Sequence, residues 1–179
     1  MADTEGTPDF HLAAYVTNLG KYNEGILQGA WFTLPTEMSE IRKKIGLNER
    51  YEEWAIHDYE APFKISEYDD IGTLNEIAEL IEETEIPDVV WNNMSELLDY
   101  FSGSVPDLIE NCENFMINSD IENEYDLGQA YIEDLDVEFP RTYLGNTIES
   151  YIDYKSLGRD IALSSQGKFL DGCWVEYIG

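Results

Sequence analysis

Apolar and polar residues alternate in three segments near the start of the chain, which predicts three β-strands. Residues 10–19 and 27–34 are rich in β-branched and aromatic side chains, and residues 52–59 carry large apolar residues at alternate positions. Residues 20–25 begin and end with glycine, so they are expected to form the loop between the first two strands.

A helix is predicted between the second and third strands. Met38, Ile41 and Ile45 recur at helical spacing, which places them on one face. Thr36 is a suitable N-cap, and Gly46 stands where a helix often ends with a left-handed residue. This helix and the three strands predict a small α/β unit.

The middle of the chain has the periodicity of helices. Thr73 and Glu76 match the T-x-x-E capping box, and an apolar stripe follows at Leu74, Ile77 and Ile81. The acids between these apolar positions are therefore expected to face water.

Prolines mark the start of two further helices in the same region. Pro87 is expected to open a helix that ends at Gly103, and Pro106 a shorter one that runs to Cys112. Residues 70–112 are therefore predicted to form a small helical unit.

The last third of the chain has mixed signals. They predict a helix that Asn123 caps and that runs to Leu135, a helical stretch that begins at Asn146 or Thr147, and a hairpin with an Asp-Gly turn at 171–172. The C-terminal unit is therefore expected to be mixed α/β.

These elements predict an α+β protein of three small domains. Residues 1–9 are polar and are expected to be disordered. An N-terminal α/β domain with a short antiparallel sheet would span residues 10–69, an acidic helical domain residues 70–112, and a mixed α/β domain residues 113–179.

The composition indicates a folded and strongly anionic protein. Hydrophobic residues make up 43% of the 179 residues, as in globular chains, whereas the formal net charge of -28 is far larger than solubility requires. Such a surface repels nucleic acid and anionic membranes, and it attracts basic proteins and DNA-binding clefts. The expected partners are therefore proteins, with neither nucleic acid nor membrane among them.

The chain carries no recognisable targeting or membrane-spanning segment. Residues 1–9 lack the basic start and apolar run of a signal peptide. Cys112 and Cys173 are two thiols without a CxxC motif, so both are expected to be small core residues. A cytoplasmic location follows as the expectation.

One long stretch of the chain contains no basic residue. Residues 65–140 include no Lys or Arg, yet they hold 22 of the chain's 38 Asp and Glu. An ordinary solvated surface mixes both signs, because like charges on neighbouring helix positions destabilise the helix. Charge of one sign over half a domain therefore indicates a partner, although plain solubility remains an alternative.

Catalytic and metal-binding motifs are absent from the sequence. His11 and His57 stand in separate predicted strands, and His57 and the adjacent Asp58 would point to opposite faces of theirs. The loop that starts at Asp120 fails as an EF-hand, because Tyr125 occupies the position of the required glycine. With 38 acids, a carboxylate pair at glycosidase spacing would arise by chance. No enzyme activity, cofactor or specific metal is predicted.

The total charge has the magnitude of a short DNA duplex. Since DNA carries one charge per ~1.7 Å of axis, a formal -28 corresponds to roughly 48 Å of duplex, or about 14 base pairs. A surface of that kind could occupy a DNA-binding cleft irrespective of sequence specificity, because phosphate contacts carry no sequence information. From composition alone, DNA mimicry and acidic solubility explain the charge equally well, and a module that binds basic proteins comes third.

Several long strings resemble the ArdA family of antirestriction proteins. They are YVTNLGKYNEG at 15–25, GAWFT at 29–33, KIGLN at 44–48, YEEWAIHDYE at 51–60 and YIDYKSLGRD at 151–160. The resemblance covers nearly the whole chain from Phe10 onward, whereas residues 70–112 resemble the family in acidity and helical character more than in particular residues.

The resemblance implies a DNA mimic borne by mobile genetic elements. Family members are elongated three-domain proteins that dimerise through the C-terminal domain and block type I restriction-modification enzymes by binding, without catalysis. Residues 128–160 align with the region of the family's antirestriction motif, here with YIEDL at 131–135 and YIDY at 151–154.

The resemblance and the charge pattern together predict that many acids spread over this chain bind in the DNA-binding cleft of the enzyme's methyltransferase core. The DNA-mimicking carboxylates are expected to be Glu76, Glu79, Glu82, Glu83, Glu85, Asp88, Glu96, Asp99, Asp107, Glu110, Glu113, Asp120, Glu122, Glu124, Asp126, Glu133, Asp134, Asp136 and Glu138. The C-terminal strand is expected to be a free edge that forms the contact of a homodimer, through Cys173, Trp174, Val175 and Tyr177.

The few basic residues beside these strings are assigned a local role. Lys21, Arg141, Lys155 and Arg159 are expected to form salt bridges that orient loops or the dimer contact. The alternative function is an acidic module that binds basic or nucleoid-type DNA-binding proteins.

Overall fold

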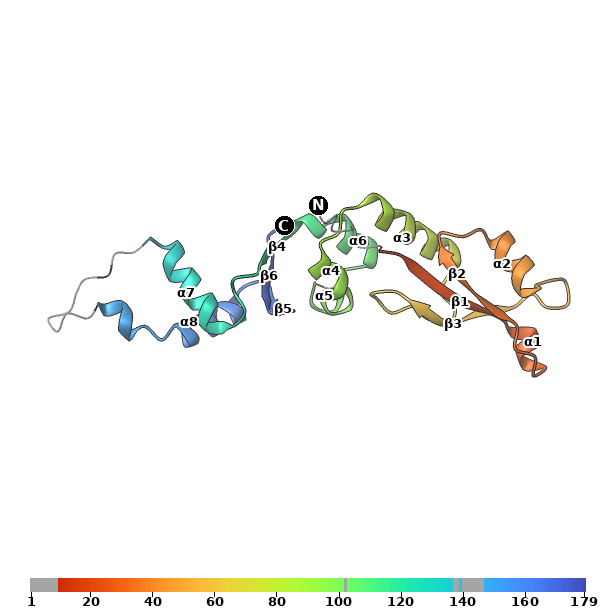
Figure 1. Ribbon diagram of the computed structural model, residues 1–179, viewed down its shortest axis with the longest axis horizontal. Coiled ribbons are helices and arrows are strands. Elements are labelled where there is room, and N and C mark those ends of the chain that lie inside the picture. Colours follow the sequence, from red (N-terminus) through yellow and green to blue (C-terminus); the bar gives the residue numbers. More distant parts are fainter. Residues whose placement is uncertain (1–9, 102, 137–138, 140–146) are drawn as a thin grey trace, which may run out of the picture. The chain divides into compact units, whose positions relative to one another are not determined.

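The computed structural model describes residues 10–101, 103–136, 139 and 147–179. The chain forms two compact units, one that ends at Cys112 and one that begins at Glu113. Helices and short antiparallel strands occur in both units (Figure 1), so the predicted α+β class is confirmed. The further division of the first unit into a sheet domain and a helical domain stays a prediction. None of the helices in the described ranges is long and apolar enough to cross a membrane.

The first unit begins with a small sheet and continues with helices. Its described elements are β1 (Leu12–Asn18), α1 (Leu19–Asn23), β2 (Gly29–Leu34), α2 (Met38–Ile45), β3 (Trp54–Glu60), α3 (Ile71–Glu83), α4 (Asp88–Asn92), α5 (Met94–Phe101) and α6 (Val105–Glu110). The three predicted strands are confirmed. The expected loop after the first strand is wrong in part, because it starts with the short helix α1.

The first sheet is antiparallel, with the strand order β2-β1-β3. The central strand β1 is almost completely buried, and α2 packs against β1 and β2 with Ile41 and Ile45 inward. Gly46 ends α2 in the left-handed conformation at φ 71°, as its position after the apolar stripe predicted.

Asn18 joins the sheet to both neighbouring helices. Its side chain is fully buried, and its Nδ2 donates to the carbonyl oxygens of Ile45 at 3.2 Å and Gly46 at 3.3 Å. Its Oδ1 accepts from the backbone N–H of Lys21 at 3.0 Å, which caps α1. One amide therefore fixes the end of β1, the start of α1 and the last turn of α2.

The apolar stripe of α3 is buried as predicted, but the expected capping box is wrong. Asp70 is the N-cap, and its Oδ2 accepts from the backbone N–H of Thr73 at 2.9 Å. The helix therefore begins one turn earlier than the pattern predicted, and Ile71 joins the buried stripe.

Thr36 does not cap α2, and Glu37 stands at the N-cap without a side-chain hydrogen bond. Instead, the backbone N–H of Thr36 donates to Asn75 Oδ1 at 2.9 Å, and Asn75 Nδ2 donates to the Thr36 carbonyl at 2.8 Å. This pair of bonds ties the segment before α2 to α3.

The helix predicted from Pro87 to Gly103 is divided into α4 and α5. Asn93 lies at the junction, where its Nδ2 donates back to the carbonyl of Val89 at 2.9 Å. The side chains of Val90, Met94 and Leu97 are buried on both sides of the break, so both helices contribute to the core although the helix is interrupted.

The second unit has its own sheet and a pair of helices. Its described elements are a 3-10 turn (Cys112–Asn114, which starts at the unit boundary), β4 (Phe115–Asn118), α7 (Glu124–Asp134), a second 3-10 turn (Ile148–Tyr151), α8 (Tyr154–Ser164), β5 (Gly167–Leu170) and β6 (Cys173–Tyr177). Asn123 caps α7, as predicted. The helical stretch expected from Asn146 or Thr147 is interrupted after Tyr151, which separates the second 3-10 turn from α8. Asp171 and Gly172 both have positive φ, so the predicted hairpin turn is confirmed.

The expectation that residues 173–178 form a free edge is wrong. The strand order is β4-β6-β5, so β6 is the middle strand and pairs on both sides. Sequence periodicity gives no strand order, and the buried side chains of Cys173, Trp174 and Val175 belong to the chain's own core. Of the four residues predicted at a dimer contact, Tyr177 alone is partly accessible.

Candidate interaction surface

The predicted carboxylates lie on the surface wherever the structure describes them. All of them are exposed except Glu124 and Asp126, which are half-buried. Glu138 lies outside the described residues. Because no described member is buried, the negative charge of both units is presented to solvent or to a partner.

The acids of α3 lie opposite its buried stripe. Glu76, Glu79, Glu82 and Glu83 are exposed, whereas the apolar residues between them are buried. Three pairs among them, Glu76 with Glu79, Glu79 with Glu82 and Glu79 with Glu83, stand three or four positions apart and therefore lie ~5–6 Å from each other. These like-charged pairs destabilise the helix, so its stability does not explain why acids occupy these positions.

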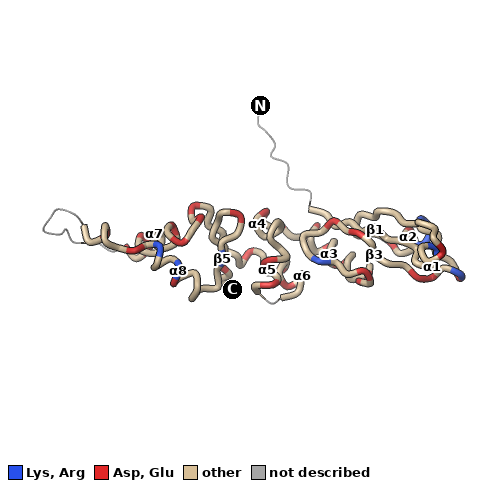
Figure 2. The backbone as a smooth tube through the Cα atoms, turned by 90° about the horizontal axis from the view of Figure 1, so that it is seen from below, with Lys and Arg blue, Asp and Glu red and all other residues tan. Residues whose placement is uncertain are grey.

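Further acids of the first unit stand on neighbouring helices. The helix α6 packs against α3 and presents Asp107 and Glu110 to solvent. Figure 2 shows acidic residues on α4, α5 and α6. The folded first unit therefore presents acids from several elements.

Three predicted carboxylates also have local structural tasks. Asp107 forms a capping box with Ser104, Asp126 accepts from the Asn123 side chain at 2.6 Å, and Glu133 accepts from Gln129 at 2.9 Å. Sequence reasoning treated all three as surface charges. An S-x-x-D spacing at 104–107 was the available signal for the first of them.

The hydrogen bonds from Ser104 also change the titration of Asp107. Its Oδ2 accepts from Ser104 Oγ at 2.5 Å and from the Ser104 backbone N–H at 3.1 Å. Because both bonds favour the ionised carboxylate, the side-chain bond most, the pKa of Asp107 lies below its ordinary value.

Half of the chain's ten Lys and Arg belong to one part of the first unit, which we name the basic end: Lys21, Arg42, Lys43, Lys44 and Arg50. Figure 2 shows basic residues on α2 and beside α1. Sequence reasoning noted Lys21 but missed the cluster, although Arg42, Lys43 and Lys44 are consecutive.

Local contacts hold part of the basic end. Arg50 Nη2 lies 3.0 Å from Glu24 Oε1, and the Tyr51 hydroxyl donates to Glu24 Oε2 at 2.8 Å. This hydrogen bond to a carboxylate raises the pKa of Tyr51 above its ordinary value. Lys21 Nζ donates to the amide oxygen of Gln28, so the salt bridge expected for Lys21 is replaced by a neutral acceptor.

In the second unit, two glycines allow α7 and α8 to approach closely. A Cβ at Gly158 would lie 1.7 Å from the Glu124 carbonyl oxygen, and one at Gly128 would lie 2.0 Å from the Tyr154 carbonyl oxygen. Only glycine fits at either position. Both residues belong to the stretch that the sequence assigned to the antirestriction motif.

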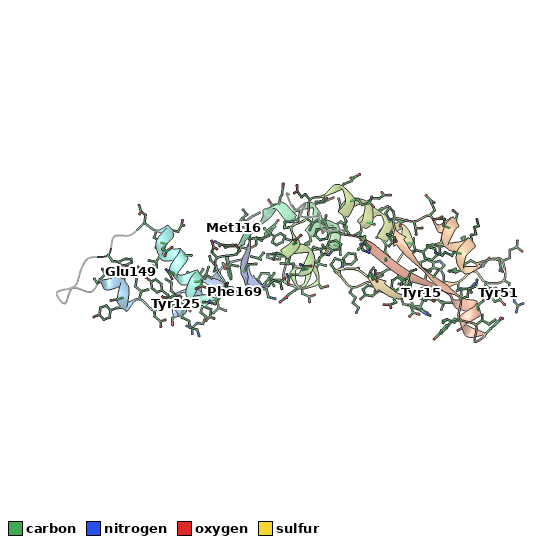
Figure 3. All side chains as sticks on the ribbon, viewed as in Figure 1. Tyr15, Tyr51, Met116, Tyr125, Glu149 and Phe169 are labelled. Carbon is green, nitrogen blue, oxygen red and sulfur yellow. The ribbon has the colours of Figure 1, made fainter. Side chains whose placement is uncertain are left out.

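Tyrosines lie on the helix pair and on the turn before α8. Tyr131 on α7 and Tyr151 in the second 3-10 turn are exposed, and the rings of Tyr125 and Tyr154 meet edge to face at 5.4 Å. Figure 3 shows Tyr125 on this pair of helices. Burial is the largest cause that raises the pKa of Tyr154, and the nearby Glu149 adds to it.

The start of α8 is fixed by a further carboxylate. Asp153 is the N-cap and accepts from the backbone N–H of Ser156 at 3.1 Å and from its hydroxyl at 2.8 Å, which lowers the pKa of Asp153. Arg159 forms the expected local salt bridge, with Asp160 at 3.3 Å. Lys155 adds to the lowering of the Asp153 pKa through its positive charge, and Arg141 lies outside the described residues.

The predicted acids and the basic end give the described surface mainly exposed charged groups. Among the described residues, no group of three or more His, Cys, Asp and Glu side chains could hold a metal ion. His57 is exposed and contacts the ring of Tyr22 edge to face at 5.0 Å. What this surface can do is bind a complementary surface.

Comparison with protein families identifies one relationship. The family model described as antirestriction protein (ArdA) matches residues 14–176, which is most of the chain. No curated protein matches the chain.

Proposed function

The chain belongs to the ArdA family of antirestriction proteins, and from this membership we propose that it inhibits type I restriction-modification enzymes as a DNA mimic. Its acidic surface would occupy the DNA-binding cleft of the methyltransferase core and thereby protect incoming mobile DNA. The inhibitor acts by binding, without catalysis, and works as a homodimer.

One observation carries this proposal. Residues 65–140 contain no Lys or Arg, and most of the described residues of this stretch lie in helices or strands. The predicted carboxylates of this stretch are exposed or half-buried wherever they are described. A cleft that binds phosphates presents Lys and Arg at close spacing, and carboxylates can replace phosphates as their counterions. Because such contacts are independent of base sequence, one inhibitor can block enzymes with different recognition sites.

The exposure of the acids also favours a distributed mechanism. An exposed ion pair contributes at most about 1 kcal/mol, because water and salt screen it. Tight binding therefore requires many weak contacts, and it should weaken as the salt concentration rises.

Competition with DNA tests the proposal. Purified protein is titrated against a type I restriction-modification enzyme on unmodified DNA at two salt concentrations, and both cleavage and DNA binding are measured. We expect stoichiometric loss of cleavage together with release of DNA, and a weaker effect at the higher salt concentration. Undisturbed cleavage at saturating protein would exclude this target, and preferential binding to a histone-like protein would favour the basic-protein alternative.

A pair of multiple variants separates the acidic surface from net charge. E76Q/E79Q/E82Q/E83Q neutralises α3, and E52Q/E53Q/D58N/E60Q removes the same charge from exposed acids elsewhere in the first unit. Glutamine and asparagine keep the shapes of glutamate and aspartate, so the fold is retained. We expect the α3 variant to inhibit less well and the control to inhibit like the wild type.

A further inference from the structure

Large apolar side chains are exposed beside the basic end. Tyr22 is 50% exposed, Ile26 51%, Leu27 71% and Trp31 42%. They come from α1, from the segment that joins α1 to β2, and from β2, which is an edge strand of its sheet. Ile26 and Leu27 are adjacent in the chain and follow Tyr22 closely, whereas Trp31 lies on the face of the sheet opposite α2, because the neighbouring Phe32 is buried. Exposed apolar side chains that gather as the first three do are of a kind that marks interaction sites.

Polar contacts link the segment that carries Ile26 and Leu27 to the end of α2. Lys21 Nζ donates to the side chain of Gln28. The same side chain lies against the end of α2, since a Cβ at Gly46 would be 2.7 Å from Gln28 Nε2. Asn18 fixes the same two segments, because it caps α1 and bonds to the last carbonyls of α2. Figure 3 shows Tyr51 at this end of the first unit.

The cations of α2 have few partners of their own. Within the described residues, Arg42, Lys43 and Lys44 form no ion pair, and Lys44 Nζ instead lies 5.0 Å from the centre of the Phe32 ring. Basic side chains in the last turn of a helix interact favourably with the negative end of its macrodipole, which explains the position of these three residues in α2. The macrodipole gives no reason for the exposed apolar side chains beside them.

We propose that the basic end and the adjacent apolar residues dock on an acidic and partly apolar protein surface of the restriction enzyme, outside its DNA-binding cleft. This inference rests on the proposed function. A cleft that attracts phosphates is itself basic, so it attracts α3 and offers no anionic partners to the cations of α2. DNA carries no basic side chains and cannot bind an acidic surface of the enzyme. This second contact would therefore be made by the inhibitor and not by the DNA that it displaces.

The chemistry of the surface favours a protein partner over a phosphate-bearing one. Exposed acids, among them Glu37, Glu40 and Glu49, surround the basic end, and the whole chain carries a formal -28. A DNA duplex or an anionic membrane bound to the basic end would lie within a Debye length of about 10 Å of these acids and would be repelled by them. Leu27 and Ile26 also require an apolar counterpart, which a DNA backbone lacks.

Two matched pairs of variants test the inference in the inhibition assay described above. K43E is compared with K64E, since both exchange one exposed lysine of the first unit, and L27S is compared with L163S, since Leu163 is 80% exposed in the second unit. We expect K43E and L27S each to raise the concentration for half-inhibition about threefold to tenfold, and both controls to stay within about twofold of the wild type.

The sign of the K43E effect is decisive. If the protein acts as a DNA mimic alone, K43E adds negative charge and leaves inhibition unchanged or improves it, and that result would overturn the second contact while the proposed function stands. Failure of the wild type to inhibit would overturn both. Binding of the wild type to a DNA duplex or to phosphatidylserine vesicles, lost in K43E, would assign the basic end to phosphates and would also overturn the inference.

Discussion

At the scale of single residues, some of the acids shape the fold as well as the surface. Asp107 holds the start of α6 through Ser104, and Asp153 holds the start of α8 through Ser156. Both carboxylates have a lowered pKa because they accept hydrogen bonds in the ionised form. Such acids would report a fold defect if they were mutated, so they are poor choices for mapping a binding surface.

The variant S104A should raise the pKa of Asp107 toward its ordinary value, because it removes the hydroxyl that is the largest cause of the shift. A lowered pKa in the folded state stabilises the fold above the unfolded-state pKa, and this contribution is lost as pH falls through the folded-state value. S104A should therefore be less stable than the wild type at pH 7, and the difference should shrink in acid. It should not vanish there, because Ser104 Oγ also accepts from the backbone N–H of Asp107 at 3.3 Å, whatever the ionisation of the carboxyl. The pKa is measured by NMR titration of the carboxyl carbon.

S119A is the matched control, since it removes an exposed serine hydroxyl in the second unit. It should leave the titration of Asp107 unchanged. An unaltered pKa of Asp107 in S104A would show that the capping box contributes nothing to the ionised state.

At the scale of elements, the second unit depends on the contact between α7 and α8. The helices approach so closely that Gly128 and Gly158 face the partner helix's backbone. The same packing positions the tyrosines of the predicted antirestriction region, so stability and surface geometry are coupled there.

G158A should destabilise the protein although alanine favours helices. The gain in helix propensity is at most about 1 kcal/mol. The new Cβ would lie 1.7 Å from the carbonyl oxygen of Glu124, which is backbone and yields only if the helices separate. Overpacking of this kind costs roughly 1–3 kcal/mol, and the backbone clash places this case near 3. Urea unfolding followed by circular dichroism measures the loss.

G103A is the matched control, because it makes the same chemical change where the nearest atom would be Asp107 Cβ at an ordinary 3.6 Å. Its free energy of unfolding should stay within about 0.5 kcal/mol of the wild type. Equal stability of G158A and the wild type would contradict the close packing.

Periodicity predicted most elements, whereas long-range hydrogen bonds decided their ends. The strands, the α3 stripe and the Asp-Gly hairpin follow from local patterns that the fold leaves intact. Thr36 fails as a cap because Asn75 engages its backbone from 39 positions away. The place of β6 in the middle of its sheet likewise depends on distant pairing. Of the site, the exposed acids were predictable from the α3 pattern, and the basic end required the folded neighbourhood of α1 and α2.

At the scale of the whole molecule, the formal charge of -28 opposes the fold. Raising NaCl from about 10 mM to about 100 mM shortens the Debye length from about 30 Å to about 10 Å. The screened repulsion should raise the melting temperature by several degrees in a thermal scan. A melting temperature that is constant or falls over this range would contradict the repulsion.

The α3 variant E76Q/E79Q/E82Q/E83Q provides the control for this effect. It removes three like-charged pairs at helical spacing, each worth a few tenths of a kcal/mol. Its melting temperature at low salt should therefore exceed that of the wild type, and its gain on adding salt should be smaller.

Stability and inhibition should thus respond to charge in opposite directions. Single changes of exposed acids that lack a capping task, such as E79A or E110A, should alter half-inhibition by less than about twofold, because each screened contact is weak. Neutralising six or more should weaken inhibition progressively while the melting temperature rises. Loss of inhibition in a more stable protein cannot come from unfolding, so the pair of measurements isolates binding. Abrupt loss from one such substitution would instead indicate a localised site and contradict the distributed surface.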